Sequence, residues 1–163
     1  MSNGNIKKKN LFLEIGVEEI PASYCLPALS QLEESVKKSF SESEIVFSKI
    51  KTYGTPRRFV LAISEIELKK GGDVELNKLG QILQKAVLSI SFSKSMRWNI
   101  FSVRFARPIR WLSALYGNEI VKFDYEGIQV GNFSYGHRFL APEKFTITGF
   151  GQYQEELRKR FVI

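Results

Sequence analysis

The 163-residue sequence is poor in the residues on which most catalytic and metal sites depend. It contains one cysteine, Cys25, and one histidine, His137. A single cysteine cannot form an internal disulfide, which is typical of a reducing compartment, and the two residues are too few for a zinc site of the usual kind. The sequence also has no glycine-rich phosphate loop and no Ser-His-Asp or Cys-His set. It therefore indicates no catalytic residue and no metal ligand.

Long apolar runs are lacking as well. No stretch approaches the roughly 20 residues that span a membrane, and the start, MSNGNIKKKN, has no apolar core of a secretory signal. The content of 44% hydrophobic and 25% charged residues is typical of a globular protein with one core. We therefore expect a cytoplasmic protein without a membrane partner. Residues 1–10 are predicted to be a disordered or tag-like start, and residues 11–163 a single domain.

Acidic residues are absent between Glu75 and Glu119, whereas seven cations lie between them. The net charge of the whole chain is +7, so the remaining segments are neutral overall. Both tryptophans, Trp98 and Trp111, belong to this basic block. Arginines beside aromatic rings are suited to holding phosphate and stacking on bases. The block therefore predicts an anionic partner such as nucleic acid.

Hydrophobic periodicity predicts an α+β fold with a mixed, mostly antiparallel sheet and two to three packing helices. We expect strands over residues 11–17, 45–56, 59–68, 111–116 and 119–125, and a short one near residues 145–147. Stripes of apolar residues three or four apart predict helices over residues 25–40, 76–90 and 153–161. Two alternatives stay open. The strand over residues 59–68 either bulges near Ser64 or restarts there, and residues 108–115 could form a short helix.

Two smaller expectations concern helix starts. Glu18 and Glu19, followed by Pro21, are predicted to lie at the first turn of the first helix, where negative charge suits the helix dipole. A pair of catalytic carboxylates is the alternative, but no second acid–base group is signalled nearby. Asp73 is a good N-cap for the second helix.

The candidate RNA contacts are cations of the basic block, an arginine pair that follows Pro56, and a His-Arg pair further along. They are Arg57, Arg58, Lys94, Arg97, Arg104, Arg107, Arg110, His137 and Arg138, with Trp98 as a stacking residue. The arginine pair could instead lie over a sheet edge, and His137 could simply satisfy a local hydrogen bond. Arginines that pair with Glu14, Glu18 or Glu19 would be lost to RNA. We expect the tryptophans and phenylalanines of the block to be mostly buried.

Five segments together resemble the N-terminal region of the β subunit of bacterial glycyl-tRNA synthetase, the kind built from separate α and β subunits. They are LFLEIGVEEIPASY (11–24), TPRRFVL (55–61), SKSMRW (93–98), RFARPIRWL (104–112) and GHRFLAP (136–142). The family's usual pattern has several tens of further residues between the second and third segments. We infer an internal deletion centred on Gly71 and Gly72, with an insertion excised near residues 69–80.

The resemblance implies ATP-dependent ligation of glycine to tRNA, with ATP and Mg²⁺ in the α subunit and no cofactor in this part of β. The implied partners are the α subunit, tRNA(Gly) and the rest of the β subunit. The chain would be non-catalytic alone and would contribute tRNA binding, subunit assembly or both. A protein–protein interface module and an editing-like domain around His137 are the alternatives.

Overall fold

The computed structural model describes residues 8–18, 22–90, 109–125, 127–137 and 139–160. Its helices are a 3-10 turn (Ala22–Tyr24), α1 (Cys25–Glu42), α2 (Leu76–Ser89) and α3 (Phe150–Lys159). Its strands are β1 (Lys9–Val17), β2 (Ile45–Val46), β3 (Lys49–Thr55), β4 (Arg58–Leu68), β5 (Ile109–Tyr116), β6 (Glu119–Ile120), β7 (Val130–Gly131), β8 (Phe133–Tyr135) and β9 (Lys144–Thr146). The predicted α+β class is confirmed.

The main sheet has the strand order β2-β4-β1-β5-β6, and β3 also pairs with β4. Its pairs are antiparallel except for the short parallel pair between β5 and β7. Strands β8 and β9 form a separate antiparallel ribbon. The prediction of a mixed, mostly antiparallel sheet is therefore confirmed.

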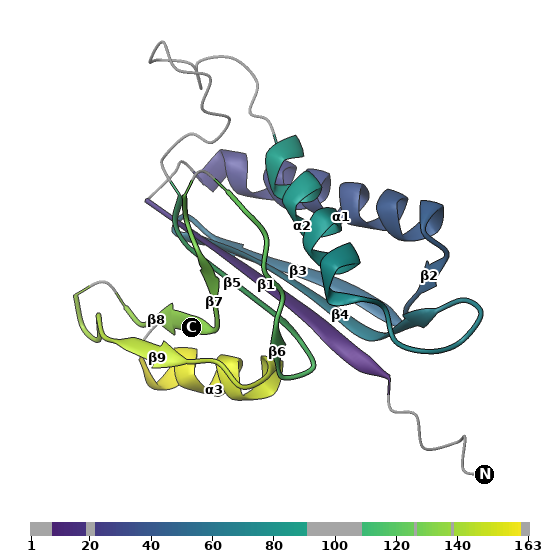
Figure 1. The fold of residues 1–163 in the computed structure, drawn as a ribbon. Coiled ribbons are helices and arrows are strands. Elements are labelled where there is room, and N and C mark those ends of the chain that lie inside the picture. The colour runs from purple at the N-terminus through teal and green to yellow at the C-terminus, as the bar shows by residue number, and fades with distance from the viewer. Residues whose placement is uncertain (1–7, 19–21, 91–108, 126, 138, 161–163) are drawn as a thin grey trace.

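Strand β1 lies at the centre of the sheet, and its two faces serve different layers. Leu11, Leu13 and Ile15 point to the main core, to which α1 and α2 contribute. Phe12 points to the opposite face and joins a second cluster with residues of β9 and α3. The sheet is thus covered on both sides, by α1 and α2 on one and by α3 with the β8–β9 ribbon on the other (Figure 1). Burial on both faces explains why β1 is apolar almost throughout.

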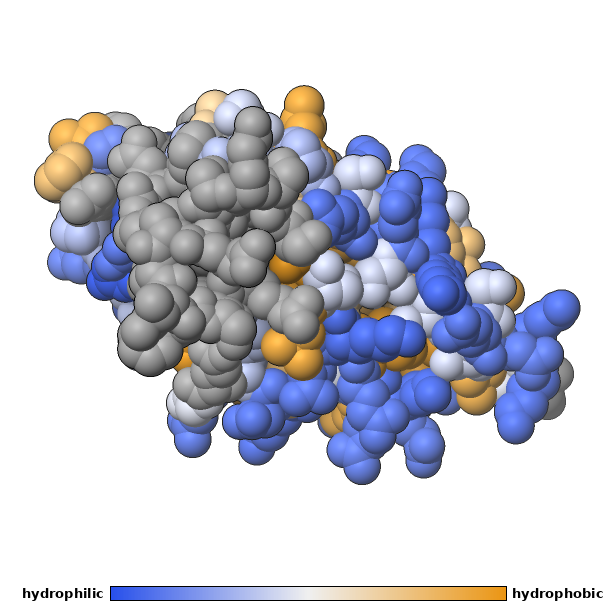
Figure 2. Space-filling model, turned by 90° about the horizontal axis from the view of Figure 1, so that it is seen from above, coloured by the Kyte–Doolittle hydropathy of each residue, from blue (hydrophilic) through white to orange (hydrophobic). Residues whose placement is uncertain are grey.

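The predicted apolar stripes are the buried faces of the helices. Helix α1 buries Cys25, Leu29, Leu32, Val36 and Phe40, and α2 buries its own stripe in the same core. The outward side of this layer, viewed from above in Figure 2, is mostly hydrophilic where the structure describes it. Of the described helices, none is long and apolar enough to cross a membrane.

The open alternatives are settled by the strand register. Strand β4 bulges rather than restarting: its pairing with β1 shifts between Lys9 and Leu11, and Glu65 has a φ of 57°. Residues Ile109–Tyr116 form a strand, so the helix alternative is wrong for them. The strand predicted over residues 119–125 is shorter, because only Glu119–Ile120 pair with β5.

Both helix-start expectations are wrong for the described residues. The N-cap of α2 is Glu75, and Asp73 instead forms an ion pair with Lys9 at 3.2 Å. Helix α1 has no acidic residue in its first turn; Glu18 lies before it and pairs with Arg110. Lys9 belongs to β1, and residues 1–7 and Glu19 lie outside the described residues.

Candidate nucleic-acid interface

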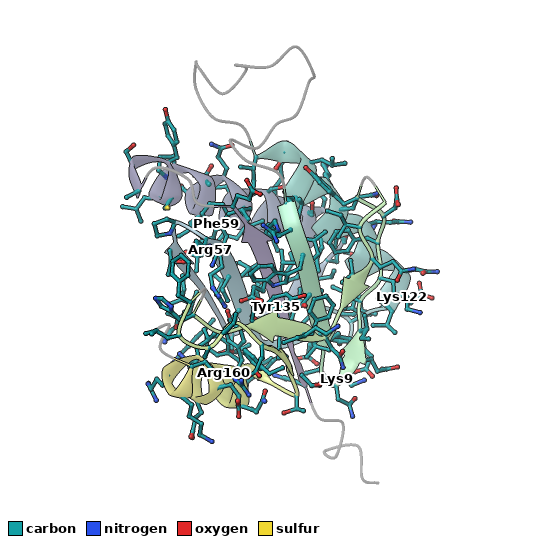
Figure 3. The ribbon with its side chains drawn as sticks, turned by 90° about the vertical axis from the view of Figure 1, so that its left-hand side faces the viewer. Lys9, Arg57, Phe59, Lys122, Tyr135 and Arg160 are labelled. Carbon is teal, nitrogen blue, oxygen red and sulfur yellow. The ribbon has the colours of Figure 1, made fainter. Side chains whose placement is uncertain are left out.

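A cleft of about 380 Å³ lies where segments distant in sequence meet at one end of the sheet. We call it the basic cleft; it is lined by Arg57, Arg110, Trp111, Tyr135, Gly136 and Pro142. Figure 3 looks onto this end of the molecule and labels two of these residues, Arg57 and Tyr135. Two of the predicted RNA contacts are thereby brought to one site, together with two aromatic rings.

The two arginines reach the cleft from different segments of the chain. Arg57 belongs to the turn between β3 and β4, whose shape is fixed because the Arg57 carbonyl accepts a hydrogen bond from the Val17 backbone at 2.9 Å. Arg110 lies near the start of β5, and its Nη1 is 3.3 Å from Glu18 Oε2, with side chains 55% and 48% exposed. An ion pair at that exposure stabilises the fold by only about 0–1 kcal/mol. A phosphate could therefore compete with Glu18 for Arg110.

Behind the cleft, three neighbouring strands place their side chains around Gly16. Gly16 of β1 is directly opposite Arg58 of β4 on one side and Trp111 of β5 on the other. Directly opposite residues point to the same face of a sheet. Because Gly16 has no side chain, the Arg58 guanidinium and the Trp111 ring approach to 5.5 Å. The glycine thus creates the space in which these two side chains meet.

Glu14, two residues earlier on the same face of β1, is the centre of a buried network. Its carboxylate accepts hydrogen bonds from Trp111 Nε1 at 2.7 Å, from Arg58 Nη1 at 3.0 Å and from the Tyr153 hydroxyl. Glu14 is fully buried, and Arg58 is only 4% exposed. A buried carboxylate with one charged and two neutral donors has its charge compensated.

The same network also holds β8 and α3 against the sheet. Arg58 also donates to Ser134 Oγ at 3.1 Å and to the Tyr135 carbonyl at 3.0 Å. Ser134 and Tyr135 belong to β8, whereas Tyr153 belongs to α3. The buried network, defined as Glu14, Arg58, Trp111, Ser134 and Tyr153, therefore fixes β8 and α3 relative to the strands that carry the basic cleft.

Tyr153 gives this network a measurable pH dependence. Burial, followed by the neighbouring Glu14 charge, raises the pKa of the Tyr153 hydroxyl well above its ordinary value of 10.0. The unfolded chain therefore loses this proton at a lower pH than the folded chain, so the Tyr153 contribution to stability is present below about pH 10 and declines above it.

We expect Tyr153→Phe to lower the free energy of unfolding at pH 7 by about 1.5–3 kcal/mol, the usual cost of losing a hydrogen bond to a charged group. The same variant should lose less stability than wild type between about pH 9 and 11, since phenylalanine has no proton to release. Urea denaturation at several pH values measures both effects. Parallel pH profiles for the two proteins would contradict this role of Tyr153.

The structure assigns Arg58 a different role from the predicted one. Its guanidinium donates to Glu14, Ser134 and the Tyr135 carbonyl, and the residue is only 4% exposed. These buried contacts hold the sheet and β8 together, so the phosphate site proposed below does not use Arg58. The alternative that arginines pair with Glu14 or Glu18 is confirmed for Arg58 and Arg110.

His137 makes local hydrogen bonds, which was the alternative to a role in RNA binding. Its Nδ1 accepts from the backbone N–H groups of Phe139 and Leu140, each at 3.1 Å. Nδ1 therefore acts as the acceptor that shapes this turn. The other candidates fall outside the described residues: Lys94, Arg97, Trp98, Arg104, Arg107 and Arg138.

The sequence did not indicate that Tyr135 lines the cleft or that Tyr153 joins the buried network, and it identified no partner for Trp111. Trp111 is buried, as expected for the aromatic residues of the basic block. Tyrosines in short or late elements carry no periodicity that links them to a glutamate in the first strand. The only sequence signal was the presence of an acidic residue in an otherwise apolar strand, because a buried charge needs partners.

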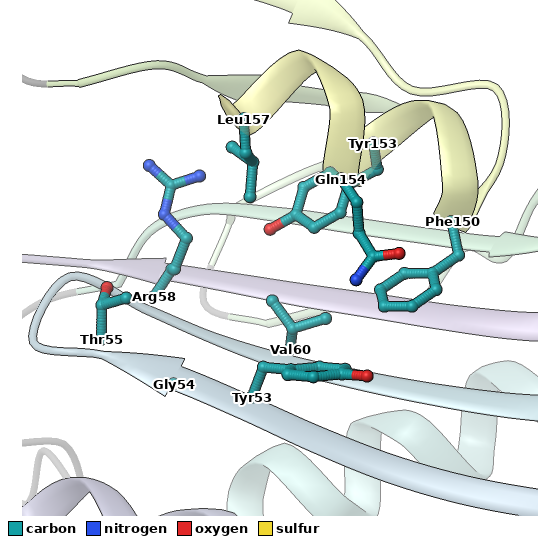
Figure 4. A pocket seen from close by; sticks show the side chains of 9 residues that line it. All are labelled: Tyr53, Gly54, Thr55, Arg58, Val60, Phe150, Tyr153, Gln154 and Leu157. Atoms are coloured by element: carbon teal, nitrogen blue, oxygen red, sulfur yellow. The ribbon is translucent and has the colours of Figure 1, made fainter. Parts of the chain in front are cut away.

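A second, mostly apolar pocket of about 200 Å³ lies between β3, β4 and α3. In Figure 4 the rings of Tyr53 and Phe150 lie at one end of it and Arg58 at the other. The two rings are stacked, with centroids 5.6 Å apart. Within the described ranges, no group of three His, Cys, Asp or Glu side chains could hold a metal ion.

The arrangement defines an α+β domain with a basic, aromatic cleft. A family model described as glycyl-tRNA synthetase beta subunit matches residues 11–78 and 67–163. The chain belongs to this family.

Among curated proteins, the chain is similar to glycine–tRNA ligase beta subunits of several bacteria. It is 31% identical to that of Syntrophus aciditrophicus, over 94% of this chain and 30% of the relative. It is 32% identical to that of Syntrophotalea carbinolica with the same coverage, and 31% identical to that of Geobacter sulfurreducens over 95% and 31%. The chain thus spans less than a third of the length of these relatives.

Four of the five family-like segments converge on this end of the sheet. Glu14 and Gly16 come from the first, Arg57 and Arg58 from the second, Arg110 and Trp111 from the fourth and Gly136 from the fifth. The SKSMRW segment lies outside the described residues. These four segments, which are far apart in the sequence, therefore lie together around the basic cleft and the buried network behind it.

The internal deletion stays a prediction. The two segments matched by the family model overlap at residues 67–78, and the alignment with the Syntrophus protein runs over 210 residues, more than the 163 of this chain. In the structure, Gly71 and Gly72 both have positive φ in a turn between β4 and α2. Such a turn brings the ends of an insertion close together, so it is where we place the excised segment.

Proposed function

We propose that this chain is a tRNA-contacting part of a glycyl-tRNA synthetase β subunit and that the basic cleft holds a phosphate of tRNA(Gly). The observation that carries the proposal is the meeting of Arg57 and Arg110 in one cleft with the Trp111 and Tyr135 rings. Arginine presents a planar fork of N–H donors that matches phosphate oxygens. The net charge of +7 would add long-range attraction to an RNA backbone.

In this proposal the chain takes no direct part in bond making. Glycine activation, ATP and Mg²⁺ are assigned to the α subunit. The part of the chain that the structure describes supplies charge and aromatic surface, and its one histidine uses Nδ1 to hold a turn. The role of the chain is then to position tRNA for chemistry carried out elsewhere in the complex.

We expect Arg57→Gln/Arg110→Gln, introduced into the assembled α–β complex, to weaken tRNA(Gly) binding and to flatten its salt dependence. Loss of the one phosphate that the cleft holds should reduce the slope of log K against log salt concentration by about 0.7–0.9. Fluorescence anisotropy titrations from low to moderate salt measure both quantities. An unchanged affinity and slope would overturn the proposal.

A control with the same change of charge is available at the opposite end of β4. Lys69 and Lys70 are exposed on the turn that follows this strand. Lys69→Gln/Lys70→Gln should leave the salt slope within experimental error of wild type. An equal loss from both double variants would indicate a general charge effect instead of a phosphate site.

Subunit assembly is the other role considered for this region. Size-exclusion chromatography of the Arg57→Gln/Arg110→Gln complex without tRNA separates it from RNA binding. The proposal predicts an intact complex that binds tRNA weakly. Dissociation of the subunits would assign the cleft to a protein interface instead.

A further inference from the structure

One edge of the main sheet has no further strand beside it in the described part of the chain. Strand β3 (Lys49–Thr55) pairs with β4 on one side only. None of its seven residues is buried, whereas in the central strand β1 all residues but the first two are buried. Alternate N–H and C=O groups of an antiparallel strand point away from its partner. The β3 edge therefore presents backbone donors and acceptors with which another extended chain can pair.

The apolar pocket of about 200 Å³ lies directly beside this edge. Tyr53, Gly54 and Thr55 of β3 line it, together with residues of β4 and α3. The rings of Tyr53 and Phe150 form one end of the pocket (Figure 4), and Tyr53 is still 39% exposed. An apolar cavity of about 150 Å³ takes up a molecule of the size of benzene. This pocket can therefore hold one leucine-sized side chain.

The residues of β3 that face the same way as the pocket follow from the period of a strand. Residues two apart share one face, so Lys49, Lys51, Tyr53 and Thr55 lie on the face toward α3, where Tyr53 stacks on Phe150. A strand added beside β3 would lie about 4.8 Å away, with alternate side chains next to these four. A side chain opposite Thr55 would have the pocket within reach, since threonine is small. Those opposite the lysines would face two ammonium groups.

The charge of this edge selects the kind of strand that can be added. Lys49 and Lys51 are exposed, and neither forms an ion pair with another described residue. The paired stretch of β3 and β4 contains no acidic residue. Lysines on an edge oppose pairing with a second, identical edge, and the net charge of +7 adds to that repulsion. An extended segment with acidic side chains is attracted instead.

We infer that the β3 edge is a docking site for an extended acidic segment of a partner protein. The segment pairs with β3 as a further strand, places one large apolar side chain in the apolar pocket and faces Lys51 and Lys49 with carboxylates. When a peptide adds to a sheet edge, main-chain hydrogen bonds supply affinity and pockets for alternate side chains supply specificity. The inference goes beyond the proposed phosphate site, because neither lysine nor Tyr53 lines the basic cleft.

The test is binding of a fluorescein-labelled peptide to the assembled α–β complex. The probe Leu-Thr-Thr-Val-Glu-Val-Glu, running antiparallel to β3, places its leucine opposite Thr55 and its glutamates opposite Lys51 and Lys49. Anisotropy titrations should show saturable binding. Alanine in place of the leucine should raise the Kd by about 10- to 100-fold, because the apolar side chain leaves the pocket. Absence of saturable binding of the parent probe would overturn the inference.

N-methylation of the probe separates strand pairing from simple charge attraction. In a peptide bound along one edge, alternate N–H groups point to the sheet and to water. The probe methylated at N–H groups of one parity should therefore lose most of its affinity, whereas the probe methylated at the other parity should bind nearly like the parent. Equal affinities of the two methylated probes would contradict pairing with β3.

Reversal of charge tests the two lysines, which are exposed and not needed for folding. Lys49→Glu/Lys51→Glu should weaken binding of the probe by about 2- to 30-fold, and it should strengthen binding of a probe with lysines in place of the glutamates. The matched control is Lys78→Glu/Lys85→Glu, at exposed positions of α2 on the other side of the sheet. Equal effects of the two double variants would indicate general charge attraction and would overturn the role of the edge.

Other occupants of the edge give different results. A second copy of the chain would make the wild-type complex larger in size-exclusion chromatography than the Lys49→Glu/Lys51→Glu complex. RNA held by the lysines would make tRNA(Gly) binding weaker in this variant than in the α2 control, with binding of the probe unchanged. Either result would overturn the inference. The phosphate site would stand or fall separately, since Arg57→Gln/Arg110→Gln tests it.

Discussion

Replacement of Glu14 by glutamine is expected to lower the free energy of unfolding of the chain by about 3–5 kcal/mol. The change removes the negative charge that faces Arg58 at 3.0 Å in the core and leaves the guanidinium buried without a counter-ion. Breaking a buried ion pair from one side costs about that much, because the remaining charge keeps its full desolvation penalty. Urea denaturation followed by circular dichroism measures the loss.

Glu33→Gln is the matched control for this experiment. Glu33 forms a 2.8 Å ion pair with Lys37 on the outer side of α1, where both side chains are partly exposed. Its removal should cost about 0.5 kcal/mol or less. If Glu14→Gln and Glu33→Gln lost similar amounts of stability, Glu14 would not be the centre of a structural network.

A double variant tests whether the cost arises from the charge left behind. Glu14→Gln/Arg58→Met has no buried charge at this position, and replacing both members of a buried ion pair is often close to neutral. We therefore expect it to be more stable than Glu14→Gln alone. A loss equal to the sum of the two single changes would show that Glu14 and Arg58 are not coupled.

Gly16→Ala is the second change for which we expect a large effect, of about 3 kcal/mol. A Cβ atom at this position would lie 2.1 Å from Cδ2 of Trp111, and Trp111 is buried and hydrogen-bonded to Glu14. The indole would have to leave its place, so the overpacking cost of about 1–3 kcal/mol adds to the loss of a hydrogen bond to a charged group. Denaturation midpoints and tryptophan fluorescence report these two consequences.

The same substitution elsewhere in the chain should have the opposite effect. Gly151 lies in the first turn of α3, and nothing lies within 4 Å of a Cβ added there. Gly151→Ala should therefore stabilise the chain by about 0.5–1 kcal/mol, since alanine is the better helix former. Destabilisation by both alanine variants would contradict the explanation based on the contact between Gly16 and Trp111.

Changes at Glu14 and Gly16 should also affect the proposed RNA site, because the core and the cleft share residues. Trp111 belongs to both the buried network and the basic cleft, and Arg58 holds Ser134 and Tyr135 of β8. A chain weakened at Glu14 or Gly16 should therefore bind RNA less well even when it remains folded. The cleft depends on the network because β8 alone is too short to fix its position.

Much of the fold followed from the sequence because it depends on local periodicity. Alternation along residues 11–17 and the stripe from Cys25 to Phe40 identified β1 and α1, since only a strand or a helix places those residues on one face. The break between the strands predicted over residues 111–116 and 119–125 and the irregularity near Ser64 were also visible, as turns and bulges change the periodicity of neighbouring residues. The family was indicated by short segments whose identity and order are specific.

Only the tertiary structure decided where each charged residue lies. Arg57 and Arg58 are neighbours in sequence, yet one lines the cleft and the other is buried against Glu14. Arg57 belongs to the turn between β3 and β4, whereas Arg58 is the first residue of β4 and its guanidinium is held by Glu14 of β1 and by Ser134 and Tyr135 of β8. The sequence by itself determined the main strands and helices, the family and the excess of positive charge. Their assembly into a cleft and a buried network required contacts between residues as far apart as Glu14 and Tyr153, which no local pattern encodes.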